Sequence, residues 1–380
     1  MDKKPEKLVP EVRFKGFTDD WEQRKLKTVV LVNSGKDYKS LEKGNIPVYG
    51  TGGYITSVSK FLSNQDAIGL GRKGTINKPY ILKAPFWTVD TLFYLTLKPE
   101  NILTFIYSLI QKINWLKYDE STGLPSLSKK NIENILVYLT KLDEQQKIGK
   151  LIVKLDKFIT LQQRKLEQLK QLKKAMLQQL FVDKNSKQPN LRFKNFNGDW
   201  KQRKGKSIFY SKSNKDFPEL TVLSATQDKG MVPRSSTGIG IKYEKKSLRG
   251  YKKVEPGDFI VHLRSFQGGF AYSDLTGIVS PAYTVFTFKQ PEMFNNYFWK
   301  EKFTSYNFIQ LLKKVTYGVR DGRSISYSDF LTLNEKFPVE VEQTKIADLF
   351  KKINNLIAFQ QNKLTQLTTL KKYLLQKLFI

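Results

Sequence analysis

Two blocks of sequence occur twice in this 380-residue chain, and this internal duplication constrains the fold more than any other feature. Residues 10–25 (PEVRFKGFTDDWEQRK) return as residues 189–204 (PNLRFKNFNGDWKQRK), at an offset of 179. Residues 144–181 return as residues 342–379, at an offset of 198 and with 20 of 38 positions identical. A repeat of this length predicts two duplicated domains and not a solenoid of short units. Because the two offsets differ, the material between the blocks has diverged in length as well as in sequence.

The second block predicts a long helix in each repeat. Apolar residues recur at a 3-4 spacing over about five heptads, with Gly149 as the one helix-breaking residue. Both helices carry the same apolar stripe, so we expect them to pair as an antiparallel coiled coil; two independent surface helices are the alternative. Gln162 and Lys165, matched by Gln360 and Lys363, would interrupt the seam and fix its register. The residues expected in this helix-pair seam are Ile148, Leu151, Leu155, Phe158, Leu169 and Leu172 in the first copy, and Ile346, Leu349, Ile353, Leu356, Leu367 and Leu370 in the second.

Short β-favouring runs separated by Gly, Asn and Pro fill the sequence between the blocks. They are Val58–Leu62, Ala67–Leu70, Tyr80–Leu82 and Leu92–Leu97 in the first half, and Phe259–Leu263, Gly277–Val279 and Tyr283–Phe288 in the second. The predicted fold class is therefore α+β: two strand-rich mixed α/β globes joined by the helix pair, as a pseudo-two-fold tandem repeat. The predicted domains are 1–141 (N-terminal segment and first globe), 142–182 (central helix), 183–340 (linker, repeated segment and second globe) and 341–380 (C-terminal helix).

The composition is strongly basic, with 65 Lys and Arg against 35 Asp and Glu and a formal charge of +30. Such an excess repels itself, and a polyanionic partner, nucleic acid before an anionic membrane, is the usual reason to keep it. The absence of Cys and the single His exclude disulfides, Cys-rich zinc sites and Cys nucleophiles. The chain starts without a signal peptide, and its longest apolar run, Ile102–Ile110, is too short to span a bilayer. We therefore expect a soluble, cytoplasmic protein.

Loops rich in Arg, Gly, Ser and Asn are the candidate DNA contacts. An Arg on a tight loop can bond guanine bidentately in the major groove, and Gln or Asn can do so with adenine. Hydroxyls and Lys beside them suit phosphate contacts. The predicted DNA-binding residues are Tyr49, Arg72, Lys73, Asn77, Lys78, Ser126, Ser128 and Lys129 in the first half, and Arg234, Arg264, Ser265, Gln267, Tyr317, Arg320, Arg323 and Ser324 in the second. We treat Arg72 and Arg264 as counterparts; for any single residue, a solvated loop charge or a turn-forming Ser is the alternative.

The sequence contains no convincing motif for catalysis or for nucleotide binding. Residues 69–74 (GLGRKG) have the glycine spacing of a dinucleotide-binding loop, but the residues that follow do not open a helix. Glu244 and Lys246, with Asp228 upstream, loosely fit a metal-dependent nuclease pattern that a Lys-rich chain matches easily. No phosphate-binding loop of the nucleoside triphosphatase type occurs in the sequence. We expect no catalytic residue, no metal site and no cofactor bound by this chain.

The chain resembles the specificity subunit of type I restriction-modification systems over nearly its whole length. The resemblance rests on the openings with Phe14, Phe17 and Trp21 and with Phe193, Phe196 and Trp200, on PVYGTGG at 47–53, on TGLPSLS at 122–128, and on the helix starts at Glu144 and Glu342. The second globe departs from the pattern, with YGVRDG at 317–322 where the first globe has TGLP. This departure weakens the transfer of individual residues there, though not of the architecture.

The resemblance implies two target recognition domains, separated by helices that measure the spacing between two unlike halves of a double-stranded DNA target. It also implies two modification subunits that bind S-adenosylmethionine, methylate adenine and contact the helices and repeated openings. Restriction subunits that hydrolyse ATP would join them, with Mg on the partners. Two other functions stay open at this point: a DNA-acting enzyme (nuclease or stand-alone methyltransferase), and a coiled-coil structural protein with a basic surface.

Overall fold

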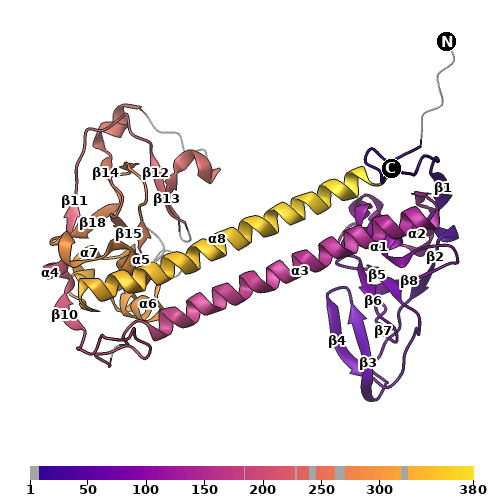
Figure 1. Cartoon of the computed structure of the whole chain (residues 1–380), viewed down its shortest axis with the longest axis horizontal. Coiled ribbons are helices and arrows are strands. Elements are labelled where there is room, and N and C mark those ends of the chain that lie inside the picture. The colour runs from indigo at the N-terminus through magenta and orange to yellow at the C-terminus, as the bar shows by residue number, and fades with distance from the viewer. Residues whose placement is uncertain (1–7, 184, 227–228, 239–244, 262–269, 318–323) are drawn as a thin grey trace, which may run out of the picture. The chain divides into compact units, whose positions relative to one another are not determined.

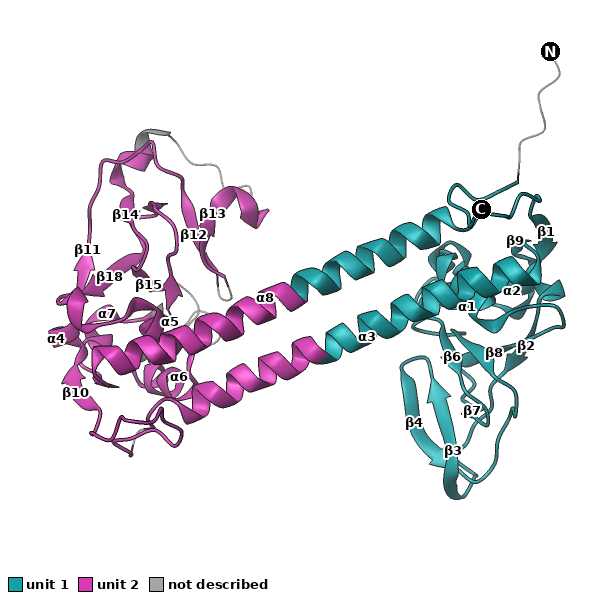
Figure 2. Ribbon diagram, viewed as in Figure 1, with its two compact units in different colours: residues 1–164, 361–380 teal, residues 165–360 magenta. Residues whose placement is uncertain are grey.

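The computed structural model describes residues 8–183, 185–226, 229–238, 245–261, 270–317 and 324–380. The chain forms two compact units, residues 1–164 with 361–380 (unit 1) and residues 165–360 (unit 2) (Figure 2). Two 38-residue helices, α3 (Leu142–Gln179) and α8 (Glu340–Lys377), cross the division, so each unit contains one end of each helix (Figure 1). Within unit 1 the two segments run antiparallel, because Ile148 shares a core with Leu378 while Asp156, further along α3, pairs with Lys371, further back in α8.

The buried stripe along the helices follows a strict 3-4 spacing, but it lies one position away from part of the predicted seam. Its members, buried or half-buried, are Ile148, Ile152, Leu155, Ile159, Gln162, Leu166, Leu169, Lys173 and Met176 in α3, and Ile346, Phe350, Ile353, Ile357, Gln360, Leu364, Leu367, Lys371 and Leu374 in α8. The prediction was wrong for Phe158, Leu172, Leu356 and Leu370, which are 43–53% exposed, and for Lys165 and Lys363, which are also exposed. Leu151 and Leu349 are half-buried beside the stripe. Both helices carry two neighbouring apolar rows, and periodicity alone did not select the buried one.

Unit 1 is built around a four-stranded antiparallel sheet with strand order β2-β8-β5-β6. The predicted strand Leu92–Leu97 is confirmed as β8. The predicted strand Val58–Leu62 is wrong, because it overlaps β4 only at Val58. A three-stranded sheet (β4-β3-β7) and the pair β1-β9 complete the unit. The elements are β1 (Glu22–Lys25), β2 (Val30–Ser34), β3 (Lys43–Gly50), β4 (Gly53–Val58), β5 (Ala67–Gly71), β6 (Tyr80–Leu82), β7 (Trp87–Thr88), β8 (Leu92–Leu97), α1 (Leu103–Lys112), α2 (Lys129–Asn134) and β9 (Leu136–Leu139).

Unit 2 repeats the four-stranded sheet, with strand order β11-β18-β15-β16. The pair β10-β21 repeats β1-β9, and the pairs β12-β13, β14-β17 and β19-β20 are its other sheets in the described part of the chain. The elements are β10 (Lys201–Lys204), α4 (Gly205–Ile208), β11 (Phe209–Lys212), β12 (Leu223–Thr226), β13 (Gly230–Pro233), β14 (Lys252–Val254), β15 (Phe259–Val261), β16 (Ala271–Tyr272), β17 (Gly277–Val279), β18 (Thr284–Phe288), α5 (Asn296–Thr304), α6 (Tyr306–Leu312), β19 (Thr316–Tyr317), β20 (Ser324–Ile325), α7 (Tyr327–Phe330) and β21 (Asn334–Phe337). The two globes, whose sequences have diverged, thus each contain a four-stranded sheet of the same topology.

The repeated segments 10–25 and 189–204, here called the openings, make the same ion pair with a long helix in both units. The guanidinium of Arg13 donates two hydrogen bonds of 2.8 Å to the buried carboxylate of Glu144, and Arg192 binds Glu342 with the same two distances. Both carboxylates sit in the first turn of a long helix, where the helix dipole also favours negative charge. A bidentate pair of this kind is among the stronger side-chain interactions, and it ties each opening to the helix that follows its globe.

The end of a long helix completes the core of each unit. In unit 1 Trp21 lies against Phe379 and Phe105, with ring centroids 6.1 and 5.8 Å away. In unit 2, at the matching positions, Trp200 lies 6.4 Å from Phe181 and 5.9 Å from Phe298. Each of these rings is buried, and burying a large aromatic side chain contributes about 1.5–3 kcal/mol. Each opening therefore packs against the end of a long helix as well as against its own globe.

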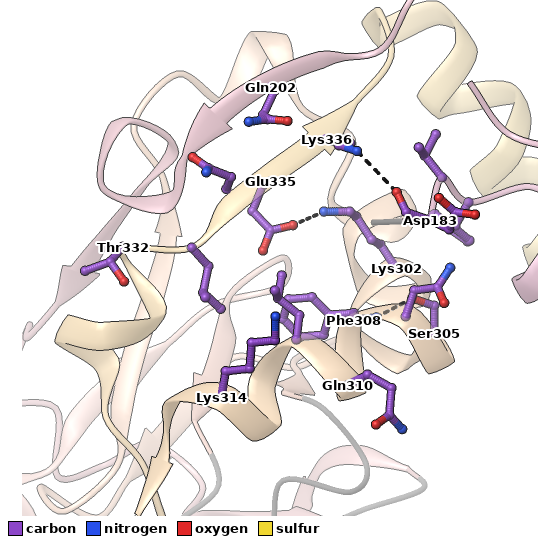
Figure 3. Close-up of a pocket in the computed structure, with 16 residues that line it drawn as sticks. Asp183, Gln202, Lys302, Ser305, Phe308, Gln310, Lys314, Thr332, Glu335 and Lys336 are labelled. Carbon is purple, nitrogen blue, oxygen red and sulfur yellow. Dashed lines mark hydrogen bonds and ion pairs between the residues drawn. The ribbon is translucent and has the colours of Figure 1, made fainter. Parts of the chain in front are cut away.

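One buried ion pair distinguishes unit 2 from unit 1. Lys302 of α5 donates to Glu335 of β21, at the edge of a pocket of about 510 Å³ (Figure 3). The matching positions in unit 1 are Leu109 and Val137, both buried: Val137 lies opposite Arg24 as Glu335 lies opposite Arg203. Burial lowers the pKa of Lys302 although Glu335 opposes this. Desolvation of such a pair commonly offsets the attraction within it.

We expect unit 2 to stay stable when the Lys302–Glu335 pair is replaced by the apolar side chains that unit 1 has at the matching positions. Lys302→Leu alone leaves Glu335 buried without its cation and should lower the free energy of unfolding by about 3–5 kcal/mol, whereas Lys302→Leu with Glu335→Val should equal or exceed the wild type. Calorimetric melting of the full chain measures both. The exposed pair Lys83–Asp66 is the matched control, because Lys83→Leu should change the melting little. A double variant as unstable as the single one would contradict the argument.

Candidate nucleic-acid interface

The structure brings together the two loops of unit 1 that carry most of the predicted DNA-binding residues. The N–H of Gly74 donates to the carbonyl of Pro125 at 2.8 Å, and the N–H of Leu127 donates to the carbonyl of Arg72 at 2.9 Å. Lys73 and Ser126 face each other in an antiparallel bridge between the loops. Residues some fifty positions apart in the sequence therefore form one surface at the end of β5.

Two glycines, Gly71 and Gly74, set the shape of the first loop. A Cβ on Gly71 would lie 2.1 Å from the carbonyl oxygen of Thr75, so the chain can double back only without a side chain there. Gly74 has a φ of +86°, a conformation that L side chains rarely adopt. The turn leaves Lys73, Asn77 and Lys78 exposed to solvent.

A carboxylate orders the second loop. Asp119 accepts hydrogen bonds from the N–H groups of Ser126 (2.9 Å) and Ser121 (3.0 Å) and from the Ser121 hydroxyl (2.8 Å). These bonds stabilise the ionised form and hold the pKa of Asp119 below its usual value. The loop that carries Ser126 is thus held in place without a partner molecule.

Arg72 is the best placed of the predicted base-contacting residues. Its guanidinium lies 5.7 Å from the centre of the Phe93 ring, within cation–π distance, and the side chain is half-buried. The 3.5 Å from its Nη1 to the carbonyl oxygen of Asp90 is long for a hydrogen bond. An Arg positioned by an aromatic face keeps its planar donor fork for a planar acceptor such as guanine.

The fold itself uses the hydroxyl of Ser128, one of the predicted phosphate contacts. Ser128 caps helix α2: its Oγ accepts from the N–H of Asn131 at 3.2 Å and donates to Glu120 at 2.8 Å. Ser326, the matching residue at offset 198, caps α7 in the same way. The recurrence of serine at this offset therefore reflects helix capping. Lys129 is exposed, with its Nζ 3.7 Å from Glu133.

Fewer of the predicted residues are described in unit 2. Arg234 is half-buried, and its Nε donates to the Ser224 hydroxyl at 3.2 Å. Tyr317 and Ser324 pair with each other across β19 and β20. Outside the described residues lie Arg264, Ser265, Gln267, Arg320 and Arg323. The correspondence of Arg72 with Arg264 thus stays a prediction.

Sequence reasoning selected Tyr49 but missed its neighbours Tyr54 and Tyr80. The ring of Tyr49 lies 6.3 Å from that of Tyr54 and 6.1 Å from that of Tyr80, centroid to centroid. The available signal was the spacing of two tyrosines around the Gly-Thr-Gly-Gly turn at residues 50–53, which is typical of a hairpin. Tyr80 comes directly after the Arg72 loop in the sequence, and its contact with Tyr49 places the start of β6 beside the β3–β4 hairpin.

Known proteins identify the architecture. Residues 18–171 match the protein-family model for the type I restriction modification DNA specificity domain. A specificity subunit of the type I restriction enzyme MjaVIII from Methanocaldococcus jannaschii is 26% identical over 339 residues, which are 83% of this chain and 76% of the relative. Over most of its length the chain is thus similar to the specificity subunits of type I restriction-modification systems.

Solved structures of this family share the fold. The S subunit of the type I restriction-modification system of M. genitalium matches 98% of this chain and 99% of its own, with a TM-score of 0.67 at 14% identity. A chain from a structural study of complex assembly and conformational transition of the type I system matches 98% and 99%, with a TM-score of 0.53 at 14% identity. None of the helices among the described residues combines the length and the apolar character that a bilayer span requires.

The capping role of Ser128 is testable by separating stability from DNA affinity. Ser128→Ala should destabilise unit 1 by about 1 kcal/mol, the usual cost of losing an N-cap, and leave DNA affinity unchanged. Ser326→Ala is the matched control, with the same cost in unit 2. Urea unfolding and fluorescence anisotropy with a labelled duplex measure the two quantities. A Ser128→Ala variant that loses affinity at unchanged stability would show that the hydroxyl contacts DNA.

Proposed function

We propose that this specificity subunit recognises a split, asymmetric double-stranded DNA target, one part through each globe. The observation that carries the proposal is the surface in unit 1, where two loops hydrogen-bonded to each other present Arg72, Lys73, Asn77 and Lys78. Backbone phosphates attract the Lys residues, and a positioned Arg can distinguish base pairs. Unit 2 repeats the sheet under a different sequence, which supports a second half-target that differs from the first.

The partners in this proposal are two modification subunits and the restriction subunits of the complex. Two modification subunits are supported by an exposed apolar row that occurs in equivalent copies on the two long helices. Its members are exposed and match at offset 198: Phe158 with Leu356, Leu161 with Phe359, and Leu172 with Leu370. Large exposed apolar side chains in a row mark protein interaction sites. Two equivalent rows fit two copies of one partner.

The chemistry in this proposal belongs to the partners. Modification subunits would bind S-adenosylmethionine, and restriction subunits would bind ATP and Mg, so the chain itself supplies recognition and assembly and no catalytic residue. The family and the sequence without nucleotide-binding or nuclease motifs support this division. The cytoplasm, where chromosomal DNA lies, is the compartment that fits such a complex.

Replacing Arg72 should change recognition in one half of the target only. In cells that carry the chain with its partners, Arg72→Ala should relax the methylated motif at one or two base pairs of the first half-site, since a bidentate contact discriminates by about 1–3 kcal/mol. Methylome sequencing measures the motif directly. Arg264→Ala should relax the other half. Lys83→Ala, an exposed cation paired with Asp66 in the same globe, is the control. A motif unchanged by Arg72→Ala would contradict this role.

A charged residue introduced into one exposed helix row should weaken the binding of one modification subunit. Phe158→Glu or Leu356→Glu should each weaken one docking site, and the double variant should weaken both, because a carboxylate in an apolar contact must be desolvated. Mass photometry of the assembled complex counts the bound subunits. Leu31→Glu places the same charge on an equally exposed Leu of β2, away from the helices, and should leave two subunits bound. Full occupancy in the double variant would refute the assignment of these rows.

A further inference from the structure

A hairpin of unit 1 carries exposed apolar side chains that no core explains. Strands β3 and β4 are joined by the two-residue turn Thr51-Gly52, and the hairpin is seen at the lower end of unit 1 in Figure 1. Just beyond the turn, Tyr54 is 63% exposed and Ile55 47% exposed. Successive side chains of a strand point to opposite faces, so both faces of the tip expose apolar surface. A partner that covers both faces must surround the tip, as a groove does.

The turn itself is open on all sides. Within 4 Å of an added Cβ, neither Gly52 nor Gly53 has any neighbouring atom, and Gly53 has a φ of +108° that a glycine tolerates best. The tip is therefore narrow and consists largely of backbone. A two-stranded ribbon of this kind fits the major groove of B-DNA, which is about 12 Å wide.

Tyr54 is held in place by neighbouring rings and hydroxyls. Its ring lies 6.3 Å from that of Tyr49 in an edge-on contact, and the Tyr49 ring lies 6.1 Å from that of Tyr80. The Tyr80 hydroxyl donates to the carbonyl of Gly50 at 2.6 Å, and the hydroxyls of Tyr54 and Ser57 are 3.1 Å apart. This tyrosine row (Tyr54, Tyr49, Tyr80) is ordered before any partner arrives, which reduces the entropy lost on binding.

Charge and continuity select DNA as the occupant. From Lys43 to Gln65 the sequence has two Lys, Lys43 and Lys60, and no Asp or Glu; Glu42 and Asp66 directly flank this span, and Asp66 is paired with Lys83. Such a segment is attracted to phosphates and offers nothing to a basic partner. At its other end the row meets the loop with Lys73, Asn77 and Lys78, because Tyr80 opens the strand that this loop enters. The last ring of the row therefore belongs to the strand into which this basic loop leads.

We propose that the β3–β4 hairpin enters the major groove of the half-site recognised by unit 1, and that Tyr54 is a specificity-determining residue there. This rests on the proposed function and adds a second contact element beside the Arg72 loop. The Tyr54 ring meets a base edge with its apolar face, as apolar side chains do with the methyl group of thymine. Ile55 extends that contact on the opposite face of the ribbon.

Unit 2 gives an internal comparison. Its hairpin β12–β13 follows β11 as the β3–β4 hairpin follows β2, and it carries Ala225 and Thr226 before its turn. Both of these side chains are half-buried. Among the described residues of this second hairpin there is no tyrosine row. Tyr54 therefore acts on one half of the target only, because the described residues of the second hairpin offer no matching tyrosine.

The experiment uses the chain assembled with its modification subunits and its target duplex as defined by methylome sequencing. Duplexes with single base-pair substitutions in each half are titrated by fluorescence anisotropy against wild type, Tyr54→Ala and Phe61→Ala. Tyr54→Ala should weaken binding of the intact target by about 10–100-fold and abolish the penalty for one substitution in the first half, while the second-half penalties stay. Phe61, 52% exposed in the same globe and outside the row, is the matched control and should change neither. Unchanged melting temperatures establish that both variants fold.

Three results would overturn the inference. Tyr54→Ala could bind the whole substitution series like the wild type, or it could lose affinity equally for every duplex. It could also keep its DNA affinity while losing a modification subunit, which would make the hairpin a protein contact. In each case Arg72→Ala reports separately on the proposed function. If the wild-type complex itself shows no preference among the duplexes, the proposed function fails, whatever Tyr54 does.

Discussion

The end of a long helix buried against a tryptophan is the contact on which the rest of this structure depends. Phe379 closes the core around Trp21, and Phe181 closes the core around Trp200, each beside a phenylalanine of the globe's own helix. The main chain reinforces this contact, because the N–H of Val12 donates to the carbonyl of Lys377 and that of Leu191 to the carbonyl of Gln179. In both units the helix end comes from the repeat that did not supply the globe. Neither repeat contains the whole of its own core.

This exchange explains why the openings are so similar while the globes are not. An opening must fit its own globe, the start of one long helix through an Arg–Glu pair, and the end of the other through its Trp. A change on one side of such a joint leaves a buried carboxylate or a cavity, and either costs several kcal/mol. The loops at the end of the sheet face no such constraint. They can therefore differ between the repeats without cost to the fold.

Sequence reasoning found the repeat, the long helices and the strands β5, β6, β8, β15, β17 and β18 because each depends on local pattern. The seam was harder, since Phe158 and Ile159 are adjacent apolar residues on neighbouring rows, and only the packed structure decides between them. Gln162 belongs to both rows and could not decide it, because Phe158 is four residues before it and Ile159 three. The available signal was Leu166, since the row through Ile159 has this apolar residue where the predicted row has Lys165. The meeting of Arg72 with Leu127 lay beyond local pattern altogether. It depends on a hydrogen bond between loops that nothing in either sequence announces.

Ser128 shows what an internal repeat can and cannot say about function. Ser128, one of the predicted DNA contacts, recurs as Ser326, and both serines cap a helix. A feature that both repeats keep is one that both need in order to fold or to bind copies of the same partner, whereas two unlike half-targets require features that the repeats do not share. By this reasoning the residues that match at a fixed offset belong to the scaffold or to its contacts with partner subunits. The recognition residues should be sought where the match breaks down: at the Arg72 loop, in the tyrosine row, and in the loops of unit 2 whose sequence departs from that of unit 1.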